Sequence, residues 1–258
     1  SKDISIPGID ELKVRGAYGT AGIRPGVDWQ YEVFSWTALG VAAASQKGNT
    51  KLKPSNTAET EVCLNVDFLK RFSFEGTYAH SVTTDQFLNV QLIPFLNNGF
   101  SQQWQNAGKV VSNTLEFTLG ANWVNKRDLT WNSNIVFSRV RQKITELPIA
   151  PYWLDPVSGD VTAFRIAPNE TYGAIYGHRM VRTLDEMSRQ LPTGKNISDY
   201  TVNREGYVIA AGTEGSTGER PILYQEDGKD WLGKIGDGNA KFNLGLSNTI
   251  NFKGISFY

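Results

Sequence analysis

The sequence predicts an all-β fold whose strands form part of a large antiparallel transmembrane β-barrel. Five stretches alternate apolar and polar residues over ten or more positions, and a tilted strand needs about 9–11 residues to cross a bilayer. Each stretch meets a tight turn that carries an aromatic residue on the apolar side, as expected for the aromatic belts at membrane interfaces. The tight turns alternate with long connections, which fits the short periplasmic turns and long outer loops of such barrels.

The first expected strand covers residues 12–20, because small and apolar residues occupy every second position there and basic residues lie between them. Its apolar side carries Leu12, Val14, Gly16 and Tyr18. Residues 21–56 are rich in Gly, Pro, Ser, Asn and aromatic residues and have no stable period. We therefore expect one long loop over residues 21–56.

The clearest alternation predicts a hairpin over residues 57–69 and 72–87, joined by a charged turn at Lys70-Arg71. A second long loop is expected over residues 88–107. A second hairpin follows over residues 110–124 and 129–145, with a tight turn at 125–128. Both hairpins place apolar residues on one side and Ser, Thr, Asn and Glu on the other.

The chain from residue 146 to residue 238 shows no long alternation and many prolines and glycines. It contains one short helix signal, since Thr183 is followed three residues later by Glu186, as in a capping box. Alternation returns over residues 241–252. A turn at Lys253-Gly254 then leads into a further strand that begins at Ile255.

Composition excludes several classes of protein. The 258 residues include 26 basic and 26 acidic ones, so the net charge is zero, and no basic block suggests nucleic-acid binding. The single cysteine, Cys63, permits neither an intrachain disulfide nor a zinc cluster and fits a small residue of the barrel wall. No apolar run approaches the roughly 18 residues of a membrane helix.

The main alternative from the pattern alone is a soluble β-sandwich, in which strands also alternate. Strands of soluble domains average about 5–6 residues, and the stretches here are roughly twice as long. Arg139 and Arg141 occupy positions that belong to the apolar side of their strand. An arginine that faces lipid at mid-membrane costs about 2–4 kcal/mol. Arg139 lies about one bilayer crossing above Leu129, so both arginines are expected to reach the headgroups.

The apolar sides of the strands are expected to face lipid, and the aromatic residues at the tight turns are expected to form the periplasmic girdle. The predicted lipid-facing wall consists of Val62, Leu64, Phe74, Phe117, Leu119, Ile135, Leu244 and Leu246. The predicted girdle consists of Phe68, Phe72, Trp123, Trp131 and Phe252.

Several motifs together resemble the SusC/RagA class of TonB-dependent outer-membrane transporters. Residues 52–62 (LKPSNTAETEV) are similar to the "L-K-P-E-x-T" motif of that class, with Ser55 in place of a usual glutamate. Further segments resemble its later motifs at roughly matching distances: 68–71 (FLKR), 76–78 (GTY), 84–88 (TDQFL), 106–110 (NAGKV), 115–117 (LEF), 175–179 (IYGHR), 183–186 (TLDE) and 235–242 (IGDGNAKF).

The resemblance implies a parent barrel of about 22 strands with an N-terminal plug. We expect residues 1–258 to be a C-terminal-half portion of one such barrel domain, with the plug and both barrel ends absent. The implied function is TonB-dependent import of a large nutrient, an oligosaccharide or a peptide, into the periplasm. The implied partners are a SusD-like surface lipoprotein that acts as a lid, TonB acting through the absent N-terminal part, and outer-membrane lipid.

Enzymatic or metal chemistry is not expected. Four acidic residues share the polar face of the first hairpin and could pair as a glycosidase does, but a charged barrel lumen explains them better: Glu59, Glu61, Asp67 and Glu75. His80 and His178 lack carboxylate companions at ligand spacing. We therefore expect no catalytic residue, no metal and no cofactor.

The aromatic residues of the two long loops are the candidate contacts for a substrate or a lid, because aromatic faces stack on sugar rings and bury apolar side chains. These residues are Trp29, Tyr31, Phe34, Trp36 and Trp104. They could instead pack the loops over the barrel mouth. Two functions other than transport stay open at this point: a structural or anchoring barrel within a larger outer-membrane assembly, and a soluble carbohydrate-binding sandwich.

Overall fold

The computed structural model describes residues 6–154 and 163–258. The described residues divide into two compact units. The first unit comprises Ser1–Pro151, Ala167–Tyr172 and Asn239–Tyr258, and the second comprises Tyr152–Ile166 and Gly173–Gly238. That the whole chain is a portion of a single barrel domain stays a prediction, and the two units are described separately below.

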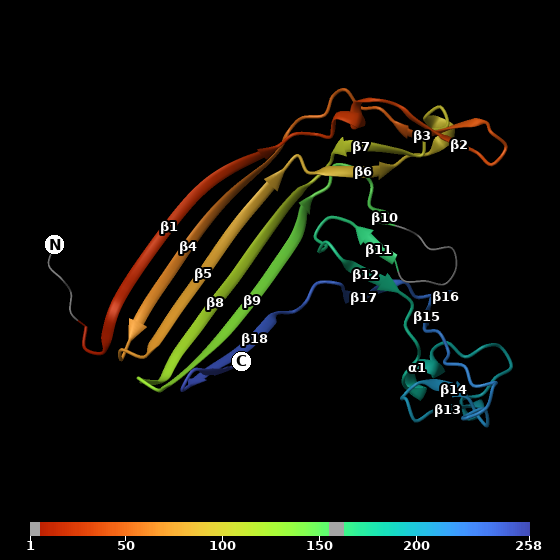
Figure 1. Cartoon of the computed structure of the whole chain (residues 1–258). Coiled ribbons are helices and arrows are strands. Elements are labelled where there is room, and N and C mark those ends of the chain that lie inside the picture. The colour runs from red at the N-terminus through yellow and green to blue at the C-terminus, as the bar shows by residue number, and fades with distance from the viewer. Residues whose placement is uncertain (1–5, 155–162) are drawn as a thin grey trace. The chain divides into compact units, whose positions relative to one another are not determined.

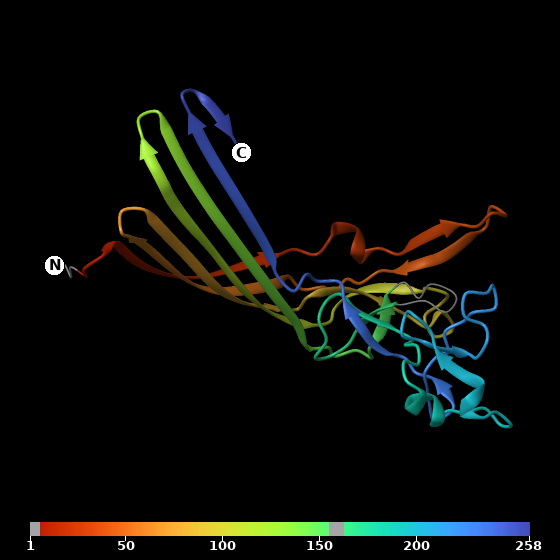
Figure 2. The same ribbon diagram turned by 90° about the horizontal axis from the view of Figure 1, so that it is seen from below.

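The first unit contains a seven-stranded antiparallel sheet, here called the wall sheet. Its order is β1 (Ile9–Ile23), β4 (Ser55–Phe68), β5 (Phe72–Thr84), β8 (Lys109–Lys126), β9 (Leu129–Glu146), β18 (Asn243–Phe252) and β19 (Ile255–Phe257). Figures 1 and 2 show its long strands side by side in one curved layer, with the tight turns together at one end. The predicted strands are confirmed. Strands β1, β8 and β9 extend beyond the predicted bounds, β4 begins two residues earlier and ends one earlier, and β5 and β18 are shorter than predicted.

The two connections expected as plain loops contain a second sheet, here called the loop sheet, so that expectation was wrong. Its order is β2 (Val33–Trp36), β3 (Ala42–Lys47), β7 (Gln102–Asn106) and β6 (Phe87–Gln91), and it is accompanied by the 3-10 turns η1 (Val27–Gln30) and η2 (Pro94–Leu96). Strands β3 and β7 are parallel and come from different connections. Strands of four to six residues are too short to show a period in the sequence.

The second unit is built from short elements around a small core. A four-stranded sheet has the order β10 (Tyr152–Leu154), β11 (Ala163–Ile166), β12 (Ala174–Gly177) and β17 (Gly233–Asp237). The remaining elements are the helix α1 (Leu184–Ser188), the 3-10 turn η3 (Ile197–Asp199), and the strand pairs β13 (Tyr200–Val202) with β14 (Val208–Ala210) and β15 (Gln225–Glu226) with β16 (Lys229–Asp230). Val181, Met187 and Val208 form the core of the unit.

The helix signal at Thr183 is confirmed by α1. The Thr183 side chain accepts a hydrogen bond from the Glu186 backbone N–H at 3.1 Å, which satisfies a donor of the first turn. The Glu186 carboxylate accepts from the Arg182 backbone N–H at 3.0 Å. Within residues 6–154 and 163–258, no helix is long and apolar enough to cross a membrane.

Candidate functional site

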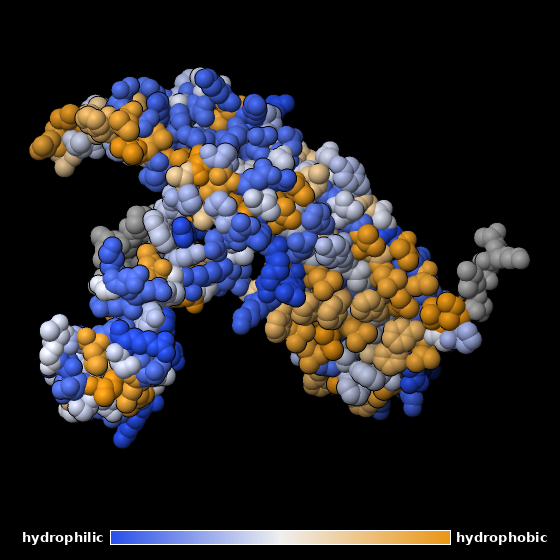
Figure 3. Space-filling model, turned by 180° about the vertical axis from the view of Figure 1, so that it is seen from behind, coloured by the Kyte–Doolittle hydropathy of each residue, from blue (hydrophilic) through white to orange (hydrophobic). Residues whose placement is uncertain are grey.

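The register of the wall sheet aligns the apolar positions of neighbouring strands. One row runs through Leu64, Gly76, Phe117, Phe137 and Leu244, and the next runs through Val66, Phe74, Leu119, Ile135 and Leu246. Val62 lies one pair further from the turns, opposite Tyr78. Because side chains alternate between the two faces of a strand, all eight predicted wall residues lie on one face of the sheet. Hydrophobic residues gather over this sheet in Figure 3.

Aromatic rings form a ladder across the middle of the apolar face. Phe117 stacks on Phe137 at a centroid distance of 4.7 Å and on Phe74 at 6.3 Å, and Phe137 continues to Phe242 at 5.8 Å. Gly76 makes room for the Phe74 ring, since a Cβ there would lie 2.9 Å from Phe74 Cζ. The sequence predicted that these residues lie on the same face of the sheet. It did not predict the ladder, which depends on the pairing register of three strands.

The predicted girdle residues lie at the turn end of the wall sheet. Phe68 stacks on Phe72 at 5.2 Å, Phe72 meets Trp123 at 5.8 Å, and Trp123 meets Trp131 at 6.0 Å. The Trp123 Nε1–H donates to Ser133 Oγ at 2.8 Å, so the ring has an apolar body and a polar partner, as interfacial tryptophans do. Phe252 is the last residue of β18, opposite Leu129.

The opposite face of the wall sheet is polar. The Arg15 guanidinium donates to Asn65 Oδ1 at 2.9 Å and lies 3.5 Å from the Glu75 carboxylate. Cys63 is buried on this face, with Sγ 2.8 Å from Thr77 Oγ1. In the described part of the chain, no three His, Cys, Asp or Glu residues are grouped as metal ligands. The face has the character of a charged wall lining an aqueous lumen.

Arg139 and Arg141, the two arginines on the apolar side of β9, differ in their contacts. The Arg141 guanidinium donates to the carbonyl oxygens of Lys241 at 2.9 Å and Ala240 at 3.3 Å. It thereby holds the segment that enters β18 against β9. Arg139 lies opposite Leu115 in the register. That both arginines lie at the level of the lipid headgroups stays a prediction.

The five candidate loop aromatics separate into two groups. Trp29 and Trp104 stack face to face at 4.0 Å, and Trp29 also meets Phe87 edge-on at 5.2 Å. Tyr31, Phe34 and Trp36 are exposed, with 60%, 54% and 78% of their surfaces accessible. Phe34 also contacts the buried Phe100 at 5.5 Å. The first group packs the loop sheet, and the second is available to a ligand or a partner.

Further exposed apolar residues of the same region were missed by sequence reasoning. Leu39, in the turn between β2 and β3, is 91% accessible, and Phe95, in η2, is 93% accessible. A hydrophobic side chain at the tip of a hairpin would have been the signal for Leu39. The prediction of a single structureless loop hid that tip.

A one-layer antiparallel sheet, with an apolar face, a polar face and an aromatic band at its tight turns, is the architecture of an outer-membrane β-barrel wall. The sequence model of the TonB dependent receptor-like, beta-barrel family matches residues 8–203. The chain therefore belongs to this family of TonB-dependent receptors.

Two curated relatives from Formosa agariphila agree with this assignment. The chain is 22% identical to TonB-dependent receptor P3 over 260 residues, which cover 95% of this chain and 24% of that relative. It is 31% identical to TonB-dependent receptor P26 over 148 residues, which cover 53% of this chain and 14% of that relative. The chain thus spans at most about a quarter of these curated relatives.

Solved structures share the fold. The RagAB peptide importer in its "closed-closed" state matches with a TM-score of 0.65 and 18% identity, over 98% of this chain and 26% of that chain. The structure of the RagAB peptide transporter matches with a TM-score of 0.64, 18% identity and the same coverage. The fold class, the likeness to the SusC/RagA class and the bacterial outer-membrane location predicted from the sequence are confirmed. The family is one of receptors for transport and not of enzymes.

Proposed function

We propose that the whole protein imports a large nutrient, an oligosaccharide or a peptide, through the outer membrane at the expense of energy delivered by TonB. A SusD-like surface lipoprotein would close over the loops as a lid. The relatives are named TonB-dependent receptors, and the solved structures of similar fold are titled as a peptide transporter and a peptide importer. The described part of the chain would supply a section of the barrel wall and its outer loops.

The observation that carries the proposal is the exposed aromatic group on the loop sheet. Phe34 and Trp36 lie in β2 and Tyr31 just before it, all on the connection between β1 and β4, at the end of the wall sheet away from the tight turns. Large aromatic faces that remain accessible can stack on sugar rings or bury apolar peptide side chains. A barrel that served only as an anchor would have no need to expose them.

The test replaces Tyr31, Phe34 and Trp36 together by alanine in the whole protein of the source bacterium. We expect nutrient uptake and recovery of the lipoprotein with the purified barrel to fall, while the amount of barrel in the outer membrane stays constant. Lys51→Ala, an exposed residue of the same connection, is the matched control and should change neither measurement.

Energy coupling separates transport from anchoring. Uptake should stop when TonB is deleted or the proton gradient is dissipated, because the proposed import depends on both. The alternative, a structural barrel that anchors a larger assembly, predicts that loss of TonB changes no uptake and that loss of the barrel disperses other surface proteins. That second pattern would refute the import proposal.

A further inference from the structure

The second unit contains a basic pocket that plays no part in the proposed wall or loop surface. The pocket has a volume of about 380 Å³. It is lined by His178, Arg179, Met180, Arg182, Tyr207, Trp231, Lys234 and Ile235. These residues come from the segment after β12, from the residue before β14, from the segment between β16 and β17, and from the start of β17. All of them belong to the second unit.

The charge of the lining is of one sign. Two arginines and a lysine line the pocket, and no aspartate or glutamate does. Two of the three cations already have carboxylate partners: Arg179 Nη1 lies 2.8 Å from Glu186, and Lys234 Nζ lies 3.7 Å from Asp237. Among the described residues, no acidic side chain forms an ion pair with Arg182. A positive charge at Arg182 therefore lies uncompensated at the edge of the cavity.

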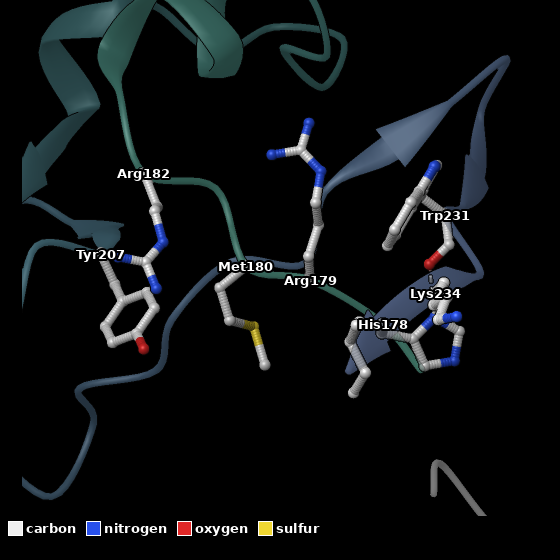
Figure 4. Close-up of a pocket in the computed structure, with 8 residues that line it drawn as sticks. His178, Arg179, Met180, Arg182, Tyr207, Trp231 and Lys234 are labelled. Atoms are coloured by element: carbon white, nitrogen blue, oxygen red, sulfur yellow. Dashed lines mark hydrogen bonds between the residues drawn. The ribbon is translucent and has the colours of Figure 1, made fainter. Parts of the chain in front are cut away.

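Arg182 is held in place by an aromatic ring and not by an acid. Its guanidinium carbon lies over the Tyr207 ring, 4.9 Å from the centroid, an arrangement that orients the planar group without using its hydrogen-bond donors. In Figure 4 the Arg182–Tyr207 pair and His178 lie on opposite sides of Met180, and the Arg179 side chain extends away from Met180. Arg182 is therefore the cation best placed to receive a ligand.

The other side of the pocket is fixed by a second contact. The His178 Nδ1 lies 2.9 Å from the Trp231 carbonyl oxygen, and because a carbonyl only accepts, Nδ1 carries the proton. The Nε2 atom of His178 then remains for a further hydrogen bond. Met180, Ile235 and the Trp231 ring add apolar surface. The pocket thus combines a planar cation, a lysine, an imidazole and apolar walls.

We propose that this pocket binds a carboxylate group carried on a ring-shaped or apolar body. A guanidinium presents paired donors that match the two oxygens of a carboxylate, and the aromatic and aliphatic walls suit the attached body. Two sources share this chemistry, the C-terminal residue of a peptide and a uronic acid residue of a polysaccharide. The site does not rest on the import proposal, since an anchoring barrel could bind the same group.

The test is calorimetric titration of the purified whole protein in detergent with two pairs of probes. One pair is digalacturonate and the neutral digalactose, and the other is a tripeptide with a free carboxyl end and its C-terminal amide. We expect at least one acid to bind and its neutral partner not to bind. Arg182→Gln should weaken binding of the acid by about tenfold or more, as loss of a charge-assisted contact does.

Matched variants distinguish binding in the pocket from nonspecific attraction to the positive charge of the protein surface. Arg204 belongs to the same unit, its side chain is 97% accessible, and it lies outside the lining, so Arg204→Gln should leave binding unchanged. Lys234→Gln should also weaken binding, and it provides a second test should Arg182→Gln fail to fold. Arg182→Lys should bind more weakly than the parent and more tightly than Arg182→Gln, because it keeps the charge and loses the planar fork.

Each outcome has a stated meaning. Binding of only the acidic peptide or only digalacturonate supports the site and identifies the source of the carboxylate. Binding that is equal for acid and neutral forms, binding that survives both Arg182→Gln and Lys234→Gln, or no binding of either acid would overturn the proposal. Because titration requires no TonB and no uptake, these results are independent of whether import occurs.

Discussion

At the scale of single residues, Trp29 and Trp104 are packed against each other and Trp36 is exposed. From the sequence, all three are expected in long loops. Trp29 and Trp104 lie on different connections and stack at 4.0 Å. The Asn49 side chain donates to the Trp104 carbonyl oxygen at 2.8 Å, and the Asn49 backbone N–H donates to the Trp29 carbonyl oxygen at 2.8 Å. This group joins the two long connections, whereas Trp36 is 78% accessible.

We predict that Trp104→Ala loosens the loop sheet and that Trp36→Ala does not. A stacked aromatic pair contributes about 0.5–1.5 kcal/mol beyond area burial, so local opening should become up to about tenfold more frequent. Hydrogen exchange of the amides in residues 26–49, measured on the whole protein by mass spectrometry, reports this opening. A larger effect of Trp36→Ala than of Trp104→Ala would contradict the division into packing and exposed aromatics.

The sequence predicts which residues share a face but not which residues touch. Alternation placed Phe74, Phe117 and Phe137 on the apolar side without any knowledge of neighbours. The ladder requires that Gly76 pair with Phe117 and Phe117 with Phe137. The second pairing follows from the tight turn between β8 and β9 together with the bulge between Asn122 and Val124. The first pairing joins β5 to β8 across the long connection that contains β6 and β7, so no turn length in the sequence predicts it. Likewise, the pocket cations were not predicted as a group, because Arg182 and Lys234 are far apart in the chain.

At the scale of elements, the turn between β4 and β5 contains two non-glycine residues with positive φ. Leu69 and Lys70, in the three-residue connection between Phe68 and Phe72, have φ values of 52° and 53°. Both central residues of a type I′ turn have positive φ, which β-carbons disfavour. The Arg71 N–H closes the turn on the Phe68 carbonyl oxygen at 3.2 Å. The start of β1 supports it, because the Asp10 carboxylate accepts from the Lys70 backbone N–H at 2.5 Å.

We predict that Lys70→Gly stabilises this hairpin by up to about 1 kcal/mol, since glycine adopts positive φ without a steric penalty. The backbone N–H that donates to Asp10 is retained in the variant. Urea denaturation of the whole protein in lipid vesicles measures the change. Lys253, which precedes Gly254 in the β18–β19 turn, also has a positive φ of 45°, so Lys253→Gly is a parallel test and should stabilise for the same reason. The prediction fails if Lys70→Gly lowers the midpoint.

The short helix α1 depends on the ionised form of Glu186. Hydrogen bonds from the Arg182 backbone, followed by the Arg179 guanidinium, hold the pKa of Glu186 below its ordinary value near 4.5. A carboxyl group whose pKa is lowered by folding stabilises the fold above its unfolded pKa, and that stabilisation is lost as the pH falls through the folded pKa. A helix of five residues has little stability of its own.

We predict that the core of the second unit opens more often as the pH is lowered below about 4.5, and that Glu186→Gln opens it at neutral pH. The pH dependence should be smaller in the variant, because glutamine does not titrate. Hydrogen exchange at Val181 and Met187, corrected for the intrinsic pH effect, is the measurement. Asp185→Asn is the control, since Asp185 and Arg189 form an exposed pair that contributes little; an equal effect would refute the role of Glu186.

At the scale of the whole molecule, the long elements were predictable and the short ones were not. Strands such as β8 and β9, of 18 residues each, repeat the alternation often enough to exclude other periods. The strands of the second unit have two to five residues, and β12 pairs with β17, which lies far along the chain. Local pattern carries no record of such pairing, so residues 146–238 yielded only α1 and two family motifs.

The wall assignment leads to the last prediction, which compares neighbouring residues of one strand. Phe117→Arg places a charge on the apolar face beside Phe137, and an arginine facing lipid at mid-membrane costs about 2–4 kcal/mol. Thr118 lies on the polar face, between Glu75 and Val136 in the register, so Thr118→Arg gains a possible carboxylate partner. We expect Phe117→Arg to prevent insertion and Thr118→Arg to be tolerated.

The experiment measures, for the whole protein, the fraction that reaches the outer membrane in a protease-resistant form. Phe117→Ala is the necessary control, because it removes the stacking on Phe137 at 4.7 Å without adding charge; it should insert, with lower stability. If Phe117→Arg inserts as well as Thr118→Arg, the apolar face does not contact hydrocarbon. The core of a soluble protein would also be destabilised by arginine at position 117. A soluble protein, however, would fold without detergent or lipid. The location of the folded protein therefore distinguishes a lipid-facing wall from a soluble core.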